Sequence, residues 1–306
     1  MKTAQQLLAT LAAVIVLAFF SVSLTNCETR KKAAQSDTET FEETLAQAEL
    51  VEKDTEEKTK GKAEESKKET FEEILAKAEQ GDVDSQYQLG ICYFYGNDVD
   101  KNEVETVKWM RKAAEQGDSD AQRSLGGIYS HGIGLVERDE AEAVKWYRKA
   151  AEQGDVVAQV ELGWHYDNGK GVDKDEAEAV KWYRKAADQG DSYAQYNIGL
   201  CYSKGKGLVK NEVEAIKWYR KAAVQGHSDA LLYLGLSYDS HDKREGDVKN
   251  DLLAYQWYLL ASAKGNETAR ENLPKLEQKL NAEQRTEGQR AATEWQAEFE
   301  KKQVEK

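Results

Sequence analysis

One stretch of sequence recurs along this chain with little change. Residues 142–155 read EAVKWYRKAAEQGD, residues 178–191 read EAVKWYRKAADQGD, and residues 214–227 read EAIKWYRKAAVQGH. Five tryptophans keep the same period, with spacings of 37, 36, 36 and 39 residues: Trp109, Trp146, Trp182, Trp218 and Trp257. A fixed period of this size is typical of structural repeats that stack on one another, so the chain is predicted to form one array rather than ordinary globular domains.

Each period is predicted to form a hairpin of two helices. In the second period, Ala121 and Leu125 lie on one face of the first helix at helical spacing. Ser119 followed by Gln122 offers a capping box for the start of that helix. Gly126 is costly inside a helix, so we expect a neighbouring helix to approach closely at that point.

The second helix of each period has a marked start and a wide apolar face. An asparagine or aspartate stands seven residues before every repeat tryptophan and predicts the N-cap: Asn102, Asp139, Asp175, Asn211 and Asn250. The apolar residues of the second copy cover a wide arc: Ala143, Val144, Trp146, Tyr147, Ala150 and Ala151. Such an arc predicts burial against neighbours on both sides, whereas Lys145, Arg148 and Lys149 are expected to stay in solvent. A single hairpin cannot bury this face, so copies are needed.

These residues resemble the Sel1-like repeat family, a branch of the tetratricopeptide superfamily. The resemblance covers residues 81–264 and rests on a Leu-Gly-x-x-Tyr motif in the first helix, a Gly-x-Gly loop and the AVKWYRKAAEQGD stretch. The first motif stands at Leu89-Gly90…Tyr93, Leu125-Gly126…Tyr129, Leu162-Gly163…Tyr166 and Leu234-Gly235…Tyr238, and Ile198 replaces leucine in the fourth copy. The resemblance implies an all-α fold, an α-solenoid of stacked helical hairpins that binds proteins or peptides as an adaptor or scaffold.

The array divides the chain into segments. Residues 1–27 are predicted to be a signal peptide or membrane anchor, 28–69 a charged and largely disordered spacer, 70–80 an N-terminal docking helix, and 265–306 a C-terminal helical cap and tail. Between them lie five repeats: 81–116, 117–153, 154–189, 190–225 and 226–264. The spacer has too few apolar residues to offset the entropy of ordering it, and a polar cap is what the end of a solenoid needs.

The first 27 residues bear on where the array sits. Lys2, an apolar run from Leu7 to Leu24 and a polar exit are typical of a secretory signal. Residues 24–27 (LTNC) resemble the bacterial lipobox, whose cysteine, here Cys27, becomes lipidated. The alternative is an uncleaved anchor helix, since eighteen apolar residues just suffice to span a bilayer. By the positive-inside rule, the basic residues 30–32 would favour keeping the downstream chain in the cytoplasm. Both interpretations predict an envelope protein anchored at a membrane by its N-terminus.

Composition and spacing exclude several function classes. The formal net charge of −13 argues against a nucleic-acid partner, because phosphate binding needs a basic face. The four histidines and three cysteines show no metal-ligand spacing, and no nucleophile–base pattern or phosphate loop appears, so we predict no metal, no cofactor and no catalytic residues. Cys92 and Cys201 occupy the same position in the first and fourth repeats, too far apart to pair, and a buried apolar role is expected for each.

Two loop features have a structural and a functional interpretation. The Gly-x-Gly loops at 132–134, 169–171 and 205–207 lack the third glycine and the preceding strand of a dinucleotide-binding motif, so they are predicted to cap helices. The acidic residues of 137–142 and 173–178 could suggest a calcium-binding site. They fall in first helical turns, however, where acids cap the helix and complement its dipole, so a capping role is predicted.

The candidate partner-binding face lies on the first helices. In tetratricopeptide relatives two positions that flank the Leu-Gly pair line the concave face. The resemblance assigns to the first position Tyr87, Arg123, Val160, Tyr196 and Leu232, and to the second Ile91, Gly127, Trp164, Leu200 and Leu236. The two positions are four residues apart and share a helix face. Trp164 departs from the repeat pattern, as a binding hot spot does. The alternative is that this face packs inward between repeats.

These features favour a membrane-tethered, non-catalytic scaffold that binds a protein or peptide partner. Two alternatives stay open. One is a secreted hydrolase resembling the cysteine-rich, β-lactam-hydrolysing branch of the family, although this sequence lacks the paired cysteines of that branch. The other is a structural envelope protein that associates with itself.

Overall fold

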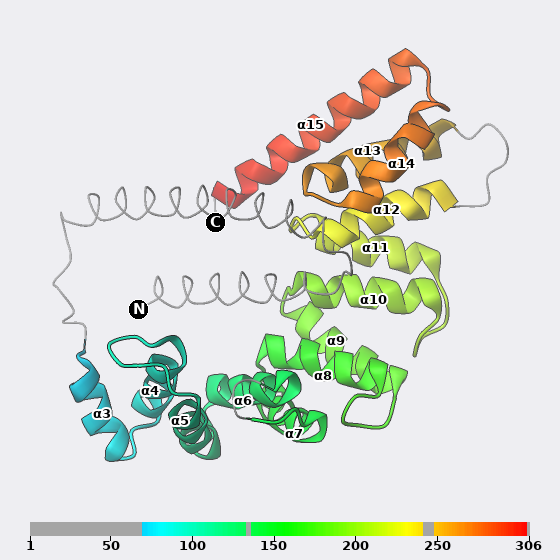
Figure 1. The fold of residues 1–306 in the computed structure, drawn as a ribbon. Helices are drawn as coiled ribbons and strands as arrows, with labels where there is room; N and C mark the ends of the chain where they lie inside the picture. Colours follow the sequence, from blue (N-terminus) through cyan, green and yellow to red (C-terminus); the bar gives the residue numbers. More distant parts are fainter. Residues whose placement is uncertain (1–68, 133–135, 241–247, 305–306) are drawn as a thin grey trace, which may run out of the picture. The chain divides into compact units, whose positions relative to one another are not determined.

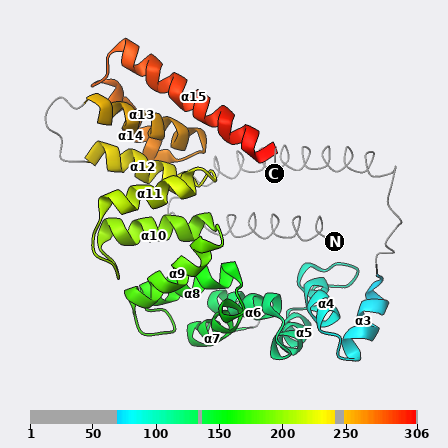
Figure 2. The same ribbon diagram turned by 180° about the vertical axis from the view of Figure 1, so that it is seen from behind.

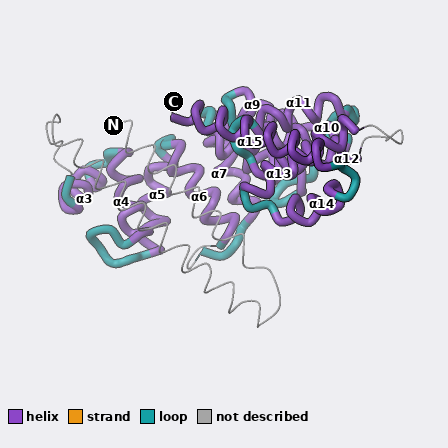
Figure 3. The backbone as a smooth tube through the Cα atoms, turned by 90° about the horizontal axis from the view of Figure 1, so that it is seen from above, coloured by secondary structure: helices purple, strands orange, loops and turns teal. Residues whose placement is uncertain are grey.

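The computed structural model describes residues 69–132, 136–240 and 248–304. Over these residues every regular element is an α-helix (Figure 3). The prediction of an all-α array of stacked helical hairpins is therefore confirmed. The predicted signal or anchor (1–27) and all but the last residue of the predicted spacer lie outside the described residues.

Ten of the described helices form five hairpins that follow one another along the array (Figures 1 and 2). The first helices of the hairpins are α4 (Val83–Tyr95), α6 (Ser119–His131), α8 (Val156–Asn168), α10 (Ser192–Lys204) and α12 (Ser228–Ser240). The second helices are α5 (Glu103–Glu115), α7 (Glu140–Glu152), α9 (Glu176–Asp188), α11 (Glu212–Ala223) and α13 (Val248–Ala263). Each helix packs against the helix before it and the helix after it, and the buried residues form a series of clusters along the array.

A short helix covers the N-terminal end of this array. Helix α3 (Phe71–Glu79) begins with a capping box at Thr70 and Glu73, in which each side chain accepts a hydrogen bond from the backbone N–H of the other. Its apolar face meets the first hairpin, where Ile74 and Ala78 share a cluster with Leu89 and Trp109. The first repeat therefore has a neighbour on both sides.

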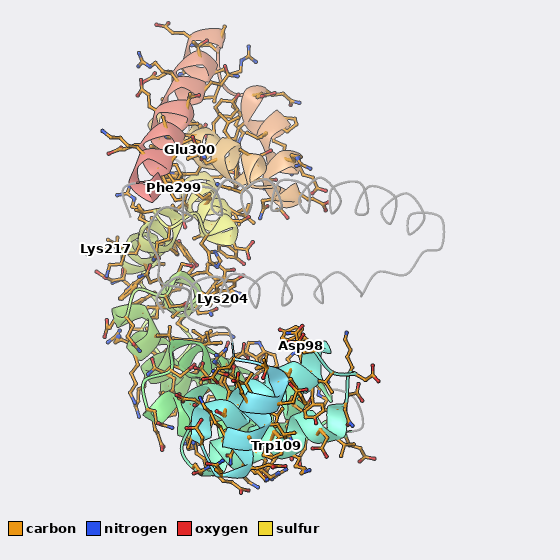
Figure 4. The ribbon with its side chains drawn as sticks, turned by 90° about the vertical axis from the view of Figure 1, so that its left-hand side faces the viewer. Asp98, Trp109, Lys204, Lys217, Phe299 and Glu300 are labelled. Atoms are coloured by element: carbon orange, nitrogen blue, oxygen red, sulfur yellow. The ribbon has the colours of Figure 1, made fainter. Side chains whose placement is uncertain are left out.

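Two helices close the C-terminal end. Helix α14 (Glu267–Glu277) packs on α13, and α15 (Ala282–Val304) also packs on α13. The ring of Trp295 lies 5.9 Å from that of Trp257, and Phe299 stacks on Trp295. Figure 4 places Phe299 near the end of α15, and its ring covers the turn at Gly226, where an added Cβ would come within 2.8 Å of it.

The helix starts only partly match the predictions. Asn102, Asp139, Asp175 and Asn211 are N-caps as predicted, each accepting backbone N–H bonds of its first turn. Asn250 is not, because α13 already begins at Val248. The capping box at Ser119 is also wrong, since the preceding residue, Asp118, caps α6 by accepting from the N–H of Ala121.

Gln122, predicted to complete that capping box, instead belongs to a ladder of glutamines that links the repeats. Its buried side chain donates to the Ala114 carbonyl at 3.0 Å and accepts from Gln153 at 2.8 Å, and Gln153 also donates to the Gly117 carbonyl. The same three bonds recur at the other rungs, which pair Gln86 with Gln116, Gln159 with Gln189, and Gln195 with Gln225. Each rung joins the turns of consecutive repeats and fixes their register.

The glycine of the Leu-Gly motif allows the two helices of a hairpin to touch, as predicted. A Cβ at Gly126 would lie 2.6 Å from the ring of Tyr147 in the second helix of the same hairpin. Gly163 and Gly199 meet Tyr183 and Tyr219 in the same way. In the first repeat the neighbour is a methionine, Met110, and the same close contact holds.

The loops within the hairpins serve two purposes. Gly132, Gly169 and Gly205 are left-handed C-caps of the first helices, as predicted. The second glycine of the loop does something else: Gly171 has a φ of 67°, and a Cβ there would overlap the backbone carbonyl of Glu140 in the preceding repeat. The loop therefore lies directly on the neighbouring repeat.

The basic residues of the repeated stretch, which were predicted to stay in solvent, make contacts with other side chains. Arg148 donates to the Tyr166 hydroxyl of the next repeat at 2.6 Å, and Arg111, Arg184 and Arg220 make the equivalent bond to Tyr129, Tyr202 and Tyr238. The ammonium of Lys149 lies 4.0 Å from the ring centroid of Trp146, which shields one side of the indole. Lys145 pairs with Glu142 at 2.8 Å and is exposed.

Two adjacent glycines of α6 predict opposite effects of the same substitution. Gly126→Ala is expected to lower stability by about 1–3 kcal/mol, because its methyl group would overlap the Tyr147 ring. Gly127→Ala is expected to raise it by about 0.5–1 kcal/mol, because that Cβ meets only the Tyr147 hydroxyl, at 3.6 Å, and alanine favours the helix. Urea unfolding followed by circular dichroism measures both, and shifts of the same sign would contradict the assigned packing.

Candidate functional site

The residues predicted to bind a partner all lie on first helices, two on each. They share one face of α4, α6, α8, α10 and α12, which we call the first-helix face: Tyr87, Ile91, Arg123, Gly127, Val160, Trp164, Tyr196, Leu200, Leu232 and Leu236. Their exposure differs widely. Leu232 is buried, Trp164 keeps 40% of its surface exposed, and the others are partly buried.

Most of these side chains contact neighbouring repeats. Tyr87 and Ile91 pack against the cluster around Leu125, and Tyr196 and Leu200 pack against the C-terminal cluster. Arg123 forms ion pairs with Asp120 and, at 3.1 Å, with Asp155. At these positions, contacts with neighbouring repeats cover much of the surface of the side chain. Trp164, in contrast, belongs to none of the core clusters of the described residues.

Two further apolar side chains of α8 and α10 are exposed, as Trp164 is. Val157 and Tyr193 are 49% and 54% exposed, and each is the second residue of its helix, on the same face as Trp164. We call these three residues the α8–α10 patch. Tyr193 is steadied by its edge-on contact with His227, whose ring lies 4.6 Å away. Sequence reasoning missed Val157 and Tyr193, although a signal exists: the same helix position is aspartate in the other repeats, at Asp84, Asp120 and Asp229.

A carboxylate lies beside the patch. Glu161 is one turn from Trp164 on α8 and makes no hydrogen bond or ion pair with any other residue that the structure describes. Burial raises the pKa of the Glu161 carboxyl, and the nearby His131 opposes that rise only in part. The buried Tyr147 of α7 is affected by this carboxylate. Burial, and to a lesser extent the charge of Glu161, raise the pKa of Tyr147 well above its usual value.

The described residues hold one cluster that superficially suggests catalysis. The Ser130 hydroxyl lies 3.4 Å from Glu140, and Nδ1 of the fully buried His165 lies 3.7 Å from the same carboxylate and 2.8 Å from the Lys170 carbonyl. The carboxylate stands between hydroxyl and imidazole, so the imidazole cannot take the serine proton as a general base. Glu212 holds Ser203 and Ser237 in the same way two repeats later, which makes the arrangement a repeat contact.

The cysteines and acids of the described residues fit structural roles. Cys92 and Cys201 form no disulfide, and Cys201 is buried as predicted, while Cys92 is only partly buried. Burial raises the pKa of the Cys201 thiol to about 12, so it is protonated at neutral pH and a poor nucleophile. Asp139 and Asp175 cap helices, and no group of three or more His, Cys, Asp or Glu side chains within the described ranges is arranged to hold a metal ion.

Comparison with known proteins agrees with this architecture. The family model of the Sel1 repeat matches five consecutive stretches: 83–118, 119–155, 156–191, 192–227 and 228–266. These cover more than half of the chain, so the chain belongs to the Sel1 repeat family. Sel1 repeats generally mediate protein–protein interaction, and the family is typically non-catalytic. A search of curated protein sequences returned no match.

Solved structures provide relatives of the fold. A protective antigen of uropathogenic Escherichia coli with an SLR fold is 34% identical, with a TM-score of 0.64, over 76% of this chain and 48% of the antigen. A Sel1 repeat protein of Oxalobacter formigenes is 36% identical, with a TM-score of 0.52, over 62% of this chain and 75% of that protein. The chain thus spans about half the length of the antigen. The cysteine-rich protein B of Helicobacter pylori matches at a TM-score of 0.34 and 29% identity, over 41% of this chain and 95% of its own.

The environment of Glu161 predicts a gain of stability on its removal. A carboxyl whose pKa is raised by folding destabilises the fold above that pKa, and the penalty vanishes below the unfolded value of about 4.3. Glu161→Gln is therefore expected to raise Tm at pH 7 by about 2 °C and to leave it unchanged near pH 3.5.

Thermal unfolding at the two pH values measures this difference. Glu271→Gln, an exposed position in the middle of α14 that removes the same charge, is the control and should show no gain at pH 7. Equal Tm values for wild type and Glu161→Gln at pH 7 would show that the carboxylate is adequately solvated.

Proposed function

We propose that this protein is a membrane-tethered, non-catalytic scaffold that binds a partner protein or peptide on the first-helix face, centred on the α8–α10 patch. The observation that carries the proposal is the exposure of Val157, Trp164 and Tyr193 on the same face of consecutive first helices. Trp and Tyr are the side chains most enriched at binding hot spots. Other exposed large apolar residues of the described part are valines, such as Val104 and Val213, whereas Trp164 and Tyr193 are aromatic.

The position of the patch also supports binding. Trp164 and Tyr193 are set on helices whose opposite faces are locked into the core by Leu162 and Ile198, both fully buried. Aromatic side chains on such a rigid frame lose little entropy when a partner covers them. Each ring makes one edge-on contact, Trp164 with His165 at 5.1 Å and Tyr193 with His227 at 4.6 Å, and each still leaves a large part of its surface exposed.

The non-catalytic part of the proposal rests on the chemistry of the described residues. The buried thiol, the hydroxyl–carboxylate–imidazole order at Ser130 and the capping role of the acids each favour a structural use. Nothing in this part of the chain favours the hydrolase alternative or self-association over a scaffold.

The membrane part of the proposal rests on the sequence of residues 1–27. Within the described ranges no helix is long and apolar enough to cross a bilayer. We place the protein in the cell envelope, exported and held there through Cys27 or through a retained N-terminal helix. A charged spacer would let the array reach partners while it stays at the membrane.

Site-specific photocrosslinking tests the binding face. A photoreactive phenylalanine analogue placed at Trp164 or Tyr193 in the full chain is expected to trap the same protein from envelope extracts. The control position is Val213, 61% exposed on α11, which should give no such adduct. With the trapped protein purified, Trp164→Ala is expected to weaken its binding by tenfold or more, about 1.4 kcal/mol. Equal adduct yields at positions 164, 193 and 213 would reject the proposed face.

Mass and acyl labelling test the tether. If Cys27 is lipidated, the mature chain lacks residues 1–26 and carries acyl label, whereas Cys27→Ala keeps the precursor mass and takes up none. A wild-type chain of full mass without label would reject lipidation and favour the retained anchor helix.

A further inference from the structure

One first helix of the array is capped by a different kind of side chain. The first helices α4, α6, α8 and α10 each begin after an aspartate whose carboxylate accepts a backbone N–H of the first turn: Asp82, Asp118, Asp155 and Asp191. At α12 the equivalent residue is His227, whose Nδ1 accepts a hydrogen bond of 3.3 Å from the backbone N–H of Ala230. The corresponding bond of α8 runs from the Ala158 N–H to Asp155 at 2.7 Å. The imidazole therefore acts as the N-cap of α12.

The cap bond requires one form of the imidazole. A neutral imidazole has one acceptor nitrogen and one N–H donor, so an Nδ1 that accepts leaves the proton on Nε2. That Nε2 atom of His227 is buried and has no hydrogen-bond partner among the residues that the structure describes. When the ring takes a second proton, Nδ1 becomes a donor that faces the Ala230 N–H, so the cap bond is lost. The new positive charge also lies at a helix N-terminus, where the helix dipole opposes it.

The same ring supports an aromatic residue of the α8–α10 patch. Tyr193 meets the His227 ring edge-on, with ring centroids 4.6 Å apart, and Tyr196 stacks on that ring at 4.8 Å. Tyr196 in turn packs against Tyr233 and the buried Tyr219. Within the described ranges, His227 is thus the ring that connects the exposed Tyr193 to the aromatic cluster of α10, α11 and α12.

The groups packed against His227 keep its imidazole neutral at neutral pH. On α12, the charge of Asp229 favours the imidazolium, but burial outweighs that charge and lowers the pKa of His227 below its ordinary value of 6.5. On α10, burial raises the pKa of both Tyr193 and Tyr196, so the two phenols are uncharged at and below neutral pH.

The neighbouring helices at this turn direct their basic side chains elsewhere. In the last turn of α11, Arg220 bonds to the Tyr238 hydroxyl, and the Lys221 ammonium lies 3.8 Å from the centroid of the Trp218 ring. From α15, the neighbour at the turn before α12 is the uncharged ring of Phe299. These contacts leave burial as the dominant influence on the imidazole.

The sign of the pH effect follows from this balance. Because folding lowers the pKa of His227, the unfolded turn binds the proton more tightly than the folded turn does. The cap is therefore fully formed above about pH 6.5 and is lost as the pH falls through the lower value of the folded protein. The aspartate caps of the other first helices differ, because a carboxyl group keeps an acceptor oxygen in either protonation state.

We propose that His227 is a positioning residue for Tyr193 and makes the α8–α10 patch sensitive to pH. The neutral imidazole caps α12 and supports the Tyr193 ring. When the imidazole takes a proton from solvent, the first turn of α12 opens and Tyr193 loses this support. The consequence for partner binding rests on the proposed scaffold function, whereas the change at α12 is a property of the fold itself.

Nuclear magnetic resonance of the full chain in an uncharged detergent tests this proposal between about pH 7.5 and pH 5, on either side of the ordinary histidine value. The probe is para-fluorophenylalanine in place of Tyr193, because its ring does not ionise. As His227 takes its proton, we expect the exchange protection of the Ala230 amide to fall about tenfold, as the loss of an N-cap predicts. The fluorine signal is expected to move towards that of the free amino acid, and the Ala158 amide should keep its protection.

Two histidine variants assign the response. His227→Asn should keep the fold, because an asparagine caps α14 at position 266 of the same array. An amide does not titrate in this range, so the variant is expected to lose the pH response both at Ala230 and at position 193. The control is His131→Asn, at an exposed histidine of α6, which should retain both responses.

The outcomes separate this inference from the scaffold proposal. Unchanged Ala230 and fluorine signals while His227 takes its proton overturn the proposal, and so does an equal response in His227→Asn. A His227 that takes up no proton down to about pH 5 also overturns it. The crosslinking yields at positions 164, 193 and 213 test the scaffold separately, because the response of His227 needs no partner and a partner can bind a patch without it.

Discussion

Each hairpin depends on a glycine in its first helix that lies against a ring in its second. Gly126, Gly163 and Gly199 each leave room for a tyrosine ring within 2.8 Å of where a Cβ would stand. This contact brings the two helix backbones together and buries the tyrosine completely or almost so. It also leaves apolar residues facing outward on both sides of the hairpin, and only another hairpin covers them. The glutamine ladder then sets the register, because each rung bonds to a buried alanine carbonyl of one repeat and to an exposed glycine carbonyl in the turn that begins the next.

The sequence predicts the parts of the fold that local chemistry determines. The tryptophan period, the N-caps at Asp139 and Asp175 and the close approach at Gly126 follow from residue spacing and helix energetics. The errors arise where two local patterns compete or the partner lies far away in sequence. Asp118 and Ser119 both suit an N-cap, and only the backbone shows that the helix starts after Asp118. The spacing of Gln122 from Ser119 fits a capping box, but the side chain that hydrogen-bonds to Gln122 belongs to Gln153, 31 residues away.

Contacts across that distance also limit how much of the candidate site can be predicted. The family resemblance places the two positions on each first helix, yet whether a side chain there is buried depends on the next repeat. Leu232 is covered and Trp164 is not, although both belong to the predicted set. Val157 and Tyr193 escaped prediction because their position is polar elsewhere and belongs to no family motif. The repeats themselves supply the missing signal, since each position can be compared with its four equivalents in the same chain.

That comparison isolates the boundary of α6 and α8. Gly127 costs helix stability that a larger residue would provide, and burial raises the pKa of the Glu161 carboxyl although the nearby His131 opposes that rise. Both residues differ from their equivalents in the other repeats, and they lie on consecutive first helices, α6 and α8. Deviations from local consistency concentrate at functional sites, and in a repeat array the remaining copies show what the same position looks like without a function.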